Sequence, residues 1–337
     1  MTWKPISGGG GSGGGGASDL SGTWLLTPSV SGIEDDPIHL TLLQAGTVLR
    51  ATVTCNDAWP GGTGSWDGVV FKLSFDFGGG DALTLGGGAA GTGIAGTFAD
   101  PGSVGTFHLD RTPTTLDCAH ACDAVAPPRF VGVDFTELAK MHEISLFRSS
   151  AGHDYADGCE TCRSMKHYFA PFAGHLVNGD VGVYSPVAGR IVSITDEGHG
   201  ASPGLENKQV RIRSSLHPEV TFLLFHVDVA AGRAAGDTVA AGDRIGTGRL
   251  VYPDLAEVAH DIDVAVRVHT PFGDRYVSWF EVVTDALFST YVARGAVARS
   301  DFVLTKAQRD ADPLACSGSA FTPGGALPAW FVLSGTE

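Results

Sequence analysis

Short runs of alternating apolar and polar residues, broken by glycine, fill most of this chain and leave little room for helices. Glycine supplies 47 of the 337 residues. Between residues 20 and 111 the runs are rich in β-branched and aromatic side chains, and a turn follows about every ten residues. A period of two with such turns predicts an all-β meander. If eight strands close into a barrel, we expect side chains to fill its interior.

The order of aromatic and glycine residues in this region resembles a small lipocalin-like or other up-and-down barrel. The residues that carry the resemblance are Trp24 after Gly22, Trp66 before Gly68, and the Gly105-Thr-Phe strand. The resemblance implies that the barrel can bind one small apolar ligand if its interior is not filled.

Composition excludes several classes of protein. The formal charge is −15, from 37 acidic and 22 basic residues, so nucleic acid and anionic lipid are not expected partners. No apolar run approaches the ~20 residues of a membrane-spanning helix. Residues 1–18 contain GGGGSGGGG, which is typical of a flexible tether. A tether of this kind is typical of an envelope-anchored bacterial lipoprotein, and we expect that an export signal lay upstream or that the start is misplaced.

The expected organisation has two folded units. After the tether at 1–18, we predict a β-barrel domain at 19–111, a Pro- and Cys-containing linker at 112–142, a second β domain at 143–303 and an irregular tail at 304–337. One helix is predicted in the second domain, from Val283 to Arg294 with Gly295 as its C-cap.

The six cysteines favour a disulfide framework in an oxidising compartment. We expect the linker to be closed by its own pair, Cys118 and Cys122, although six cysteines allow fifteen pairings. A zinc site made by the two close pairs and His120 is an alternative, as is a redox Cys159-x-x-Cys162. An extracytoplasmic location, whether secreted, periplasmic or on the cell surface, follows from the first interpretation.

Two segments of the second domain are specific in combination. Tyr184-Ser-Pro-Val-Ala-Gly189 joins two strands through a turn, and a Gly-Asp pair occurs at Gly236 and again six residues later at Gly242. Each Gly-Asp pair predicts a tight turn, with Val239 and Ile245 pointing inward. This geometry is shared by biotinyl and lipoyl carriers and by lysostaphin-like peptidases. A carrier needs a lysine at a hairpin tip, and none occurs between Lys208 and Lys306.

The chain therefore resembles the lysostaphin-like (LytM-type) zinc endopeptidases of peptidoglycan over residues 143–283. The resemblance implies a metal ligand at Asp154, within Gly152-His-Asp-Tyr, and a catalytic histidine at His226. It also implies cell-wall peptidoglycan, or another envelope protein, as the partner.

The sequence departs from the family at its closing His-x-His. The matching segment is His260-Asp261-Ile-Asp263, so strand alternation places Asp261 and Asp263 where the two histidines are expected. Ser150 occupies the place of the first histidine ligand, and His153 with Asp157 offers a second register. The predicted metal ligands are Asp154, Asp261, Asp263 and His153, with His260 as a further option. Carboxylates in place of imidazoles shift the preference from zinc toward Ca²⁺ or Mn²⁺.

Three functions follow as hypotheses. The first is a degenerate peptidase homologue that acts in cell-wall recognition or regulation. The second is an active metal-dependent endopeptidase with a non-standard Asp/His ligand set, in which His226 stabilises the oxyanion. The third is binding of a small apolar ligand by the barrel. His167 is interpreted as part of an exposed insertion near Cys159 and Cys162, without a catalytic role.

Overall fold

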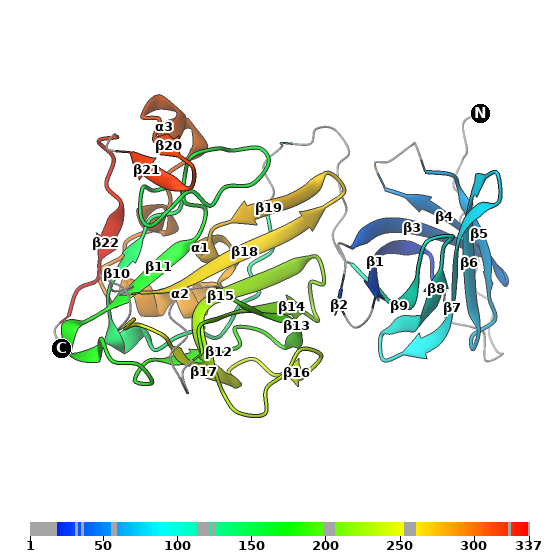
Figure 1. Ribbon diagram of the computed structural model, residues 1–337, viewed down its shortest axis with the longest axis horizontal. Coiled ribbons are helices and arrows are strands. Elements are labelled where there is room, and N and C mark those ends of the chain that lie inside the picture. Colours follow the sequence, from blue (N-terminus) through cyan, green and yellow to red (C-terminus); the bar gives the residue numbers. More distant parts are fainter. Residues whose placement is uncertain are drawn as a thin grey trace.

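Two β-sheets with separate cores make up most of the protein (Figure 1). The computed structural model describes residues 19–30, 33–34, 37–54, 59–112, 122, 126–197, 206–252, 261–322 and 325–335. The predicted tether, Cys55, Cys118, His120 and His260 lie outside these residues. The all-β fold class is confirmed. None of the described helices is long and apolar enough to cross a membrane.

The first sheet is a closed antiparallel barrel. Strands β1 and β3 to β9 pair in chain order, and β9 pairs back with β1, so eight strands form the ring and β2 extends it beside β1. This is the up-and-down meander that the alternating pattern predicts. The strands are β1 (Gly22–Val30), β2 (Ile33–Glu34), β3 (Ile38–Ala45), β4 (Val48–Val53), β5 (Gly62–Trp66), β6 (Phe71–Gly78), β7 (Asp81–Ala90), β8 (Gly93–Ala99) and β9 (Val104–Arg111).

Side chains fill the interior of the barrel, as expected. Trp24, Phe71, Phe75 and Phe107 are almost fully buried in one apolar cluster. A hollow of about 170 Å³ remains beside Trp59. Ligand pockets usually measure ~300–1,000 Å³, so this hollow is too small for most ligands.

Inward-facing glycines let the barrel strands approach one another closely. A Cβ atom at Gly96 would overlap the carbonyl oxygen of Gly86 on the neighbouring strand, and one at Gly64 would overlap the carbonyl oxygen of Lys72. At Gly86 itself a Cβ atom would meet open space. The tight curvature on this side therefore depends on particular glycines, because any side chain there would separate the strands.

We predict that Gly96→Ala lowers the free energy of unfolding of the barrel by about 2 kcal/mol or more, because the added methyl group meets backbone atoms that cannot move aside. Gly86→Ala, on the paired strand, is the matched control and should change stability by less than ~0.5 kcal/mol. Urea unfolding followed by tryptophan fluorescence measures both. Equal effects in the two variants would contradict the explanation.

The second sheet has eleven strands and is called here the large sheet. Its main order is β16-β13-β14-β15-β18-β11-β10-β22, with β12, β17 and β19 paired at its sides. The strands are β10 (Met141–Ser145), β11 (His167–Pro171), β12 (Gly182–Tyr184), β13 (Gly189–Asp196), β14 (Lys208–Ser214), β15 (Val220–Val229), β16 (Thr238–Val239), β17 (Arg244–Gly248), β18 (Ile262–Thr270), β19 (Gly273–Val277) and β22 (Trp330–Val332).

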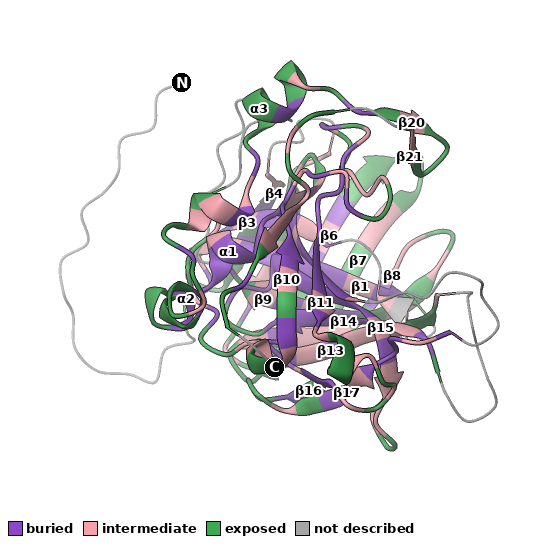
Figure 2. Cartoon of the chain, turned by 90° about the vertical axis from the view of Figure 1, so that its left-hand side faces the viewer, coloured by how far each residue is buried: buried purple, intermediate pink, exposed green. Residues whose placement is uncertain are grey.

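The core of the large sheet lies on the face that β15 and β18 present to the helices. Figure 2 shows that the buried residues gather in the middle of the molecule. The two predicted Gly-Asp turns form at its edge. Gly236 and Gly242 have φ angles of 97° and 85°, which suit glycine. The carboxylate that follows each glycine accepts a hydrogen bond from a backbone N–H three residues upstream. Val239 and Ile245 are buried, as predicted.

The predicted helix is shorter than its periodicity suggested. It forms as α2 (Asp285–Val292), because Thr284 caps its N-terminus and accepts a hydrogen bond from the Leu287 N–H. A separate turn, α1 (Trp279–Val282), precedes it and is closed by a capping box of Ser278 and Glu281. The described residues also form 3₁₀ turns at η1 (Leu138–Lys140), η2 (Ala173–His175) and η3 (Arg299–Phe302).

The prediction of an irregular tail was wrong. Residues 304–337 contain α3 (Lys306–Ala311), the hairpin of β20 (Ala315–Ser317) and β21 (Ala320–Thr322), and β22, which pairs with β10. The predicted linker also contributes to the large core, through Val131 and Phe135. Long-range pairing of this kind leaves little local signal in a sequence.

Two disulfides are present among the described residues. Cys122 bonds to Cys159 and Cys162 bonds to Cys316. The expectation that Cys118 and Cys122 close the linker was therefore wrong, because Cys122 is bonded to a segment of the large sheet domain. Covalent bonds fix both sides of the short loop between Cys159 and Cys162.

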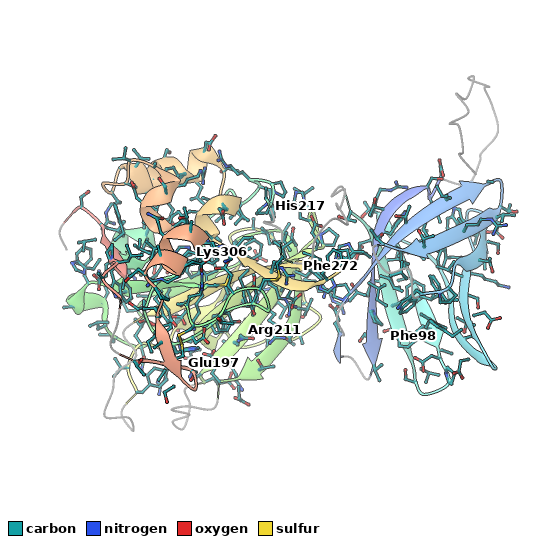
Figure 3. All side chains as sticks on the ribbon, turned by 90° about the horizontal axis from the view of Figure 1, so that it is seen from above. Phe98, Glu197, Arg211, His217, Phe272 and Lys306 are labelled. Atoms are coloured by element: carbon teal, nitrogen blue, oxygen red, sulfur yellow. A yellow bond between two sulfur atoms is a disulfide. The ribbon has the colours of Figure 1, made fainter. Side chains whose placement is uncertain are left out.

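Polar contacts join the barrel to the large sheet. The Glu34 carboxylate of β2 lies 3.3 Å from Arg190 and 2.8 Å from Arg213. The His39 ring stacks on the His269 ring at a centroid distance of 5.4 Å, and its Nε2 lies 3.0 Å from the His269 carbonyl oxygen. In Figure 3 the nearby Phe272 and His217 lie on the side of the large sheet that faces the barrel.

We predict that acid weakens the protein through His39. Burial, reinforced by His269, lowers the pKa of His39 from 6.5 to about 4. The folded state therefore favours the neutral His39 ring. The contribution of this neutral ring to the free energy of unfolding is complete above pH 6.5 and is lost as the pH falls toward 4. Between pH 7 and 4.5 the free energy of unfolding of the wild-type protein should fall by roughly 2 kcal/mol more than that of His39→Gln. Urea unfolding at both pH values measures this, and parallel losses would contradict it.

Candidate functional site

Neighbouring strands of the large sheet bring three of the predicted site residues together, namely His226, Asp261 and Asp263. Tyr168 of β11 lies opposite Asp263 of β18, and Leu224 of β15 lies opposite Val264. Val264 and Leu224 belong to the core, so Asp263 faces the other side of the sheet. Asp261 lies on this side as well, because side chains alternate along a strand. We call this side the site face.

A buried ion pair lies at the centre of the site face. The Lys166 Nζ is 2.6 Å from Asp263 Oδ2, and the exposed fractions of the two side chains are 2% and 0%. Lys166 immediately precedes β11 and shares its face with Tyr168. Three aromatic rings surround the ammonium, at centroid distances of 4.3 Å for Phe225, 4.7 Å for Tyr168 and 5.1 Å for Tyr155. These contacts supply cation–π attraction in addition to the charge pair.

Both partners are charged at neutral pH. Burial alone would raise the pKa of Asp263, but Lys166 and then His226 hold it well below its usual range. Burial alone would lower the pKa of Lys166, but Asp263 raises it above its usual value. A buried charge is tolerated only with a partner of this kind, so removing either side chain would leave an uncompensated ion.

Asp261 behaves differently from Asp263. Asp261 is half-buried, and the desolvation of its carboxyl together with the neighbouring Asp263 charge raises its pKa well above the usual value. Two adjacent buried carboxyl groups rarely ionise together. Asp261 is therefore the neutral member of the pair, and Asp263 is the anion.

His226 is held in an unusual backbone conformation. Its φ angle is 56°, which is uncommon for a residue other than glycine. The register of β15 shifts by one residue between Leu224 and Val227, so this strand leaves β18 and pairs with β17 from Val227 onward. The His226 N–H donates to Glu197 Oε2, and its carbonyl oxygen accepts a hydrogen bond from the Arg249 N–H. A bulge of this kind redirects a side chain.

The His226 ring lies among hydrogen-bonding and charged groups. Its Nδ1 is 2.9 Å from the Tyr252 hydroxyl and 3.0 Å from Glu197 Oε2, and its Nε2 is 3.6 Å from Asp263 Oδ2. Burial would lower the pKa of His226, but Asp263 and Glu197 raise it to about 10. The ring is therefore an imidazolium at neutral pH. In Figure 3, Glu197, which directly follows β13, lies well separated from the barrel.

The predicted residues do not all meet. Asp154 Oδ1 accepts a hydrogen bond from the Arg163 N–H, and its own N–H donates to the Ser319 carbonyl oxygen. The first contact lies within the 148–166 segment, and the second joins this segment to the tail. His153 is exposed beside the site, where desolvation and the Lys166 charge lower its pKa. Asp157, which belongs to the second register, accepts hydrogen bonds from the N–H groups of Cys159 and Glu160.

The interpretation of His167 as part of an exposed insertion was wrong. His167 begins β11 and is 1% exposed. Its ring nitrogens lie 2.7 Å from the Ser145 carbonyl oxygen and 2.8 Å from the Ser278 hydroxyl. The ring packs on the core face, opposite to Lys166, so its role is structural.

The 148–166 segment is rigidly attached next to the site. The Arg148 guanidinium pairs with the Glu160 carboxylate at 2.7 Å, and Arg163 pairs with the same carboxylate at 2.7 Å. Arg163 reaches Asp310 of α3 as well. The two disulfides bond this segment to Cys122 and Cys316. These contacts fix Tyr155 and Lys166 over the site face.

Three groups lie close enough to share one metal ion. In the part of the chain that the structure describes, the ligand atoms of His226, Asp261 and Asp263 form the one such group, within 4.8 Å of one another. The surrounding charges do not suit a resident divalent ion. Lys166 already neutralises Asp263, and His226 and Asp261 would both have to release a proton. A dication would then lie beside a buried ammonium, so the residues present do not fit a catalytic zinc.

Sequence reasoning missed Lys166, Glu197 and Tyr252. Lys166 alone left a usable signal, because alternation along His167–Pro171 places residues 166 and 168 on the face opposite to the buried His167. The other two residues come from distant elements and reach His226 only through the tertiary fold.

Known proteins offer limited comparison. No family model matches this chain, and no curated protein matches its sequence. Among solved structures it is similar to a zinc-containing peptidase from Vibrio cholerae, with 14% sequence identity and a TM-score of 0.27. The match covers 68% of this chain and 54% of that one, so the chain spans about half the length of that peptidase. This TM-score is too low to transfer a function, and the role of the site rests on its own residues.

We predict that the His226 ring titrates near pH 10 in the wild-type protein and nearer to its ordinary value of 6.5 in Asp263→Asn. A raised pKa means that the imidazolium stabilises the fold fully below pH 6.5 and that this contribution is lost as the pH rises through 10. Nitrogen-15 NMR of the imidazole ring measures both titrations. A wild-type midpoint near 6.5 would show that Asp263 and Glu197 do not act on this ring.

Proposed function

We propose that this protein acts outside the cytoplasm as a peptidase-type domain that recognises cell-wall peptide or an envelope protein without hydrolysing it. One observation carries the proposal, namely the Lys166 ammonium bound to Asp263 Oδ2 at 2.6 Å, at a position where the resemblance implies a metal ligand. A catalytic zinc needs ligands with free lone pairs and an open position for water. Here the central carboxylate is already neutralised by a side chain of the same protein.

The charge balance supports a non-hydrolytic site. Lys166 and His226 each contribute a positive charge, and Asp263 and Glu197 each contribute a negative charge, while Asp261 is neutral. These five side chains therefore sum to zero without any additional ion. A dication would have to displace protons and overcome the repulsion of Lys166.

An extracytoplasmic location is supported by the two disulfides among the described residues. Disulfides form and persist in oxidising compartments. The acidic composition fits a partner that is neutral or cationic.

A second candidate function is that of an active metal-dependent peptidoglycan endopeptidase with an Asp/His ligand set. Two observations favour it: the grouping of His226, Asp261 and Asp263 within 4.8 Å, and the buried Asp263 Oδ1, which has no hydrogen-bond partner among the described residues.

We expect the purified, unchelated protein to contain substoichiometric zinc, manganese and calcium by elemental analysis, and to release no soluble fragments from peptidoglycan. It should nevertheless sediment with insoluble peptidoglycan. Gly86→Ala, altered only in the barrel, serves as the control for folded protein. Near-stoichiometric metal that is absent from Asp263→Asn, together with fragment release, would establish the second candidate instead.

A further inference from the structure

The Lys166 ammonium has the surroundings of a bound cation. One carboxylate oxygen lies 2.6 Å away, and the faces of Phe225, Tyr168 and Tyr155 lie between 4.3 and 5.1 Å away. Aromatic faces combined with a carboxylate are a common way in which proteins hold a cation out of water. In this protein the cation is attached to the chain.

We propose that Lys166 is a built-in cation that takes the place of a divalent metal, and that removing its charge converts His226, Asp261 and Asp263 into a metal-binding group. The inference rests on the proposed non-hydrolytic function and explains it. It names Lys166 as the residue that prevents metal binding, although three potential ligands lie within 4.8 Å of one another.

The backbone fixes the ammonium in this position. The Met165 N–H donates to the Tyr155 carbonyl oxygen, and the Tyr155 N–H donates to the Arg163 carbonyl oxygen. The backbone of Tyr155 is therefore fixed beside the residues that precede Lys166. The Tyr155 ring packs edge-on against Phe225, and its hydroxyl accepts a hydrogen bond from the Tyr276 hydroxyl. These contacts close the space around the Lys166 side chain, which is 2% exposed and lies against Asp263.

An uncharged residue of nearly the same length would change the site in a defined way. Methionine at position 166 keeps an unbranched, apolar stem among the three rings but leaves the Asp263 carboxylate without its partner. An unpaired buried carboxylate is strongly unfavourable, and a divalent ion that also binds Asp261 and His226 would relieve it.

Calorimetric titration with zinc chloride alone tests the inference at pH 7.5. Wild-type protein, Lys166→Met, Lys166→Met/Asp263→Asn and the control Lys306→Met are compared. Lys306 is an exposed lysine on α3, paired with Asp310. We expect zinc affinity to rise by more than about tenfold in Lys166→Met, equivalent to 1.4 kcal/mol. The gain should disappear in the double variant, and the control should behave as wild type.

The outcomes separate the inference from the proposed function. If wild-type protein binds zinc tightly through Asp263, both are overturned. If wild-type protein does not bind zinc and folded Lys166→Met gains no affinity, only the inference is overturned.

A second variant covers the case in which Lys166→Met does not fold. Lys166→Ala leaves a cavity, and methylammonium chloride supplies the missing ammonium group. We expect its thermal unfolding temperature to rise with methylammonium concentration, and not with tetramethylammonium or in Lys166→Ala/Asp263→Asn. The absence of this response would overturn the inference.

Discussion

The site face is organised around a lysine that cannot be buried without its counter-charge. Lys166 and Asp263 are both nearly inaccessible to water, and each keeps the other ionised. Asp263 in turn holds the His226 ring in its protonated form and forces the adjacent Asp261 to stay neutral. One ion pair therefore sets the protonation of two other groups. It also requires the aromatic segment around Tyr155 to stay closed over the sheet, because water would weaken the pair.

Backbone irregularities place the remaining groups of the site. The bulge in β15 turns His226 away from the regular alternation, and the change of partner from β18 to β17 at this point lets Glu197 and Tyr252 reach the ring. A left-handed residue that is not glycine costs conformational energy. The hydrogen bonds to its N–H and carbonyl groups offset this cost.

Local patterns predicted the fold well and the site only in part. Period-two alternation predicts strands because it depends on neighbouring residues, and the two Gly-Asp turns formed as expected with Val239 and Ile245 buried. The same alternation correctly places Asp261 and Asp263 together. Asp154 was expected at the metal site from a motif, but its carboxylate stabilises a loop instead.

Other features depend on contacts between distant residues. The burial of His167, the ion pair of Lys166 and the pairing of Cys122 with Cys159 all need the tertiary fold, which local periodicity does not specify. The roles predicted for the site residues and the domain boundaries at 111, 142 and 303 stay predictions.

The bond between Cys162 and Cys316 has a consequence for proteolysis. It joins residues 154 positions apart, and the loop it closes contains most strands of the large sheet. A protease that cuts once within that loop leaves a single covalent molecule of almost unchanged mass until a reductant is added. The tail therefore stays covalently attached to the 148–166 segment even after the backbone between them has been broken.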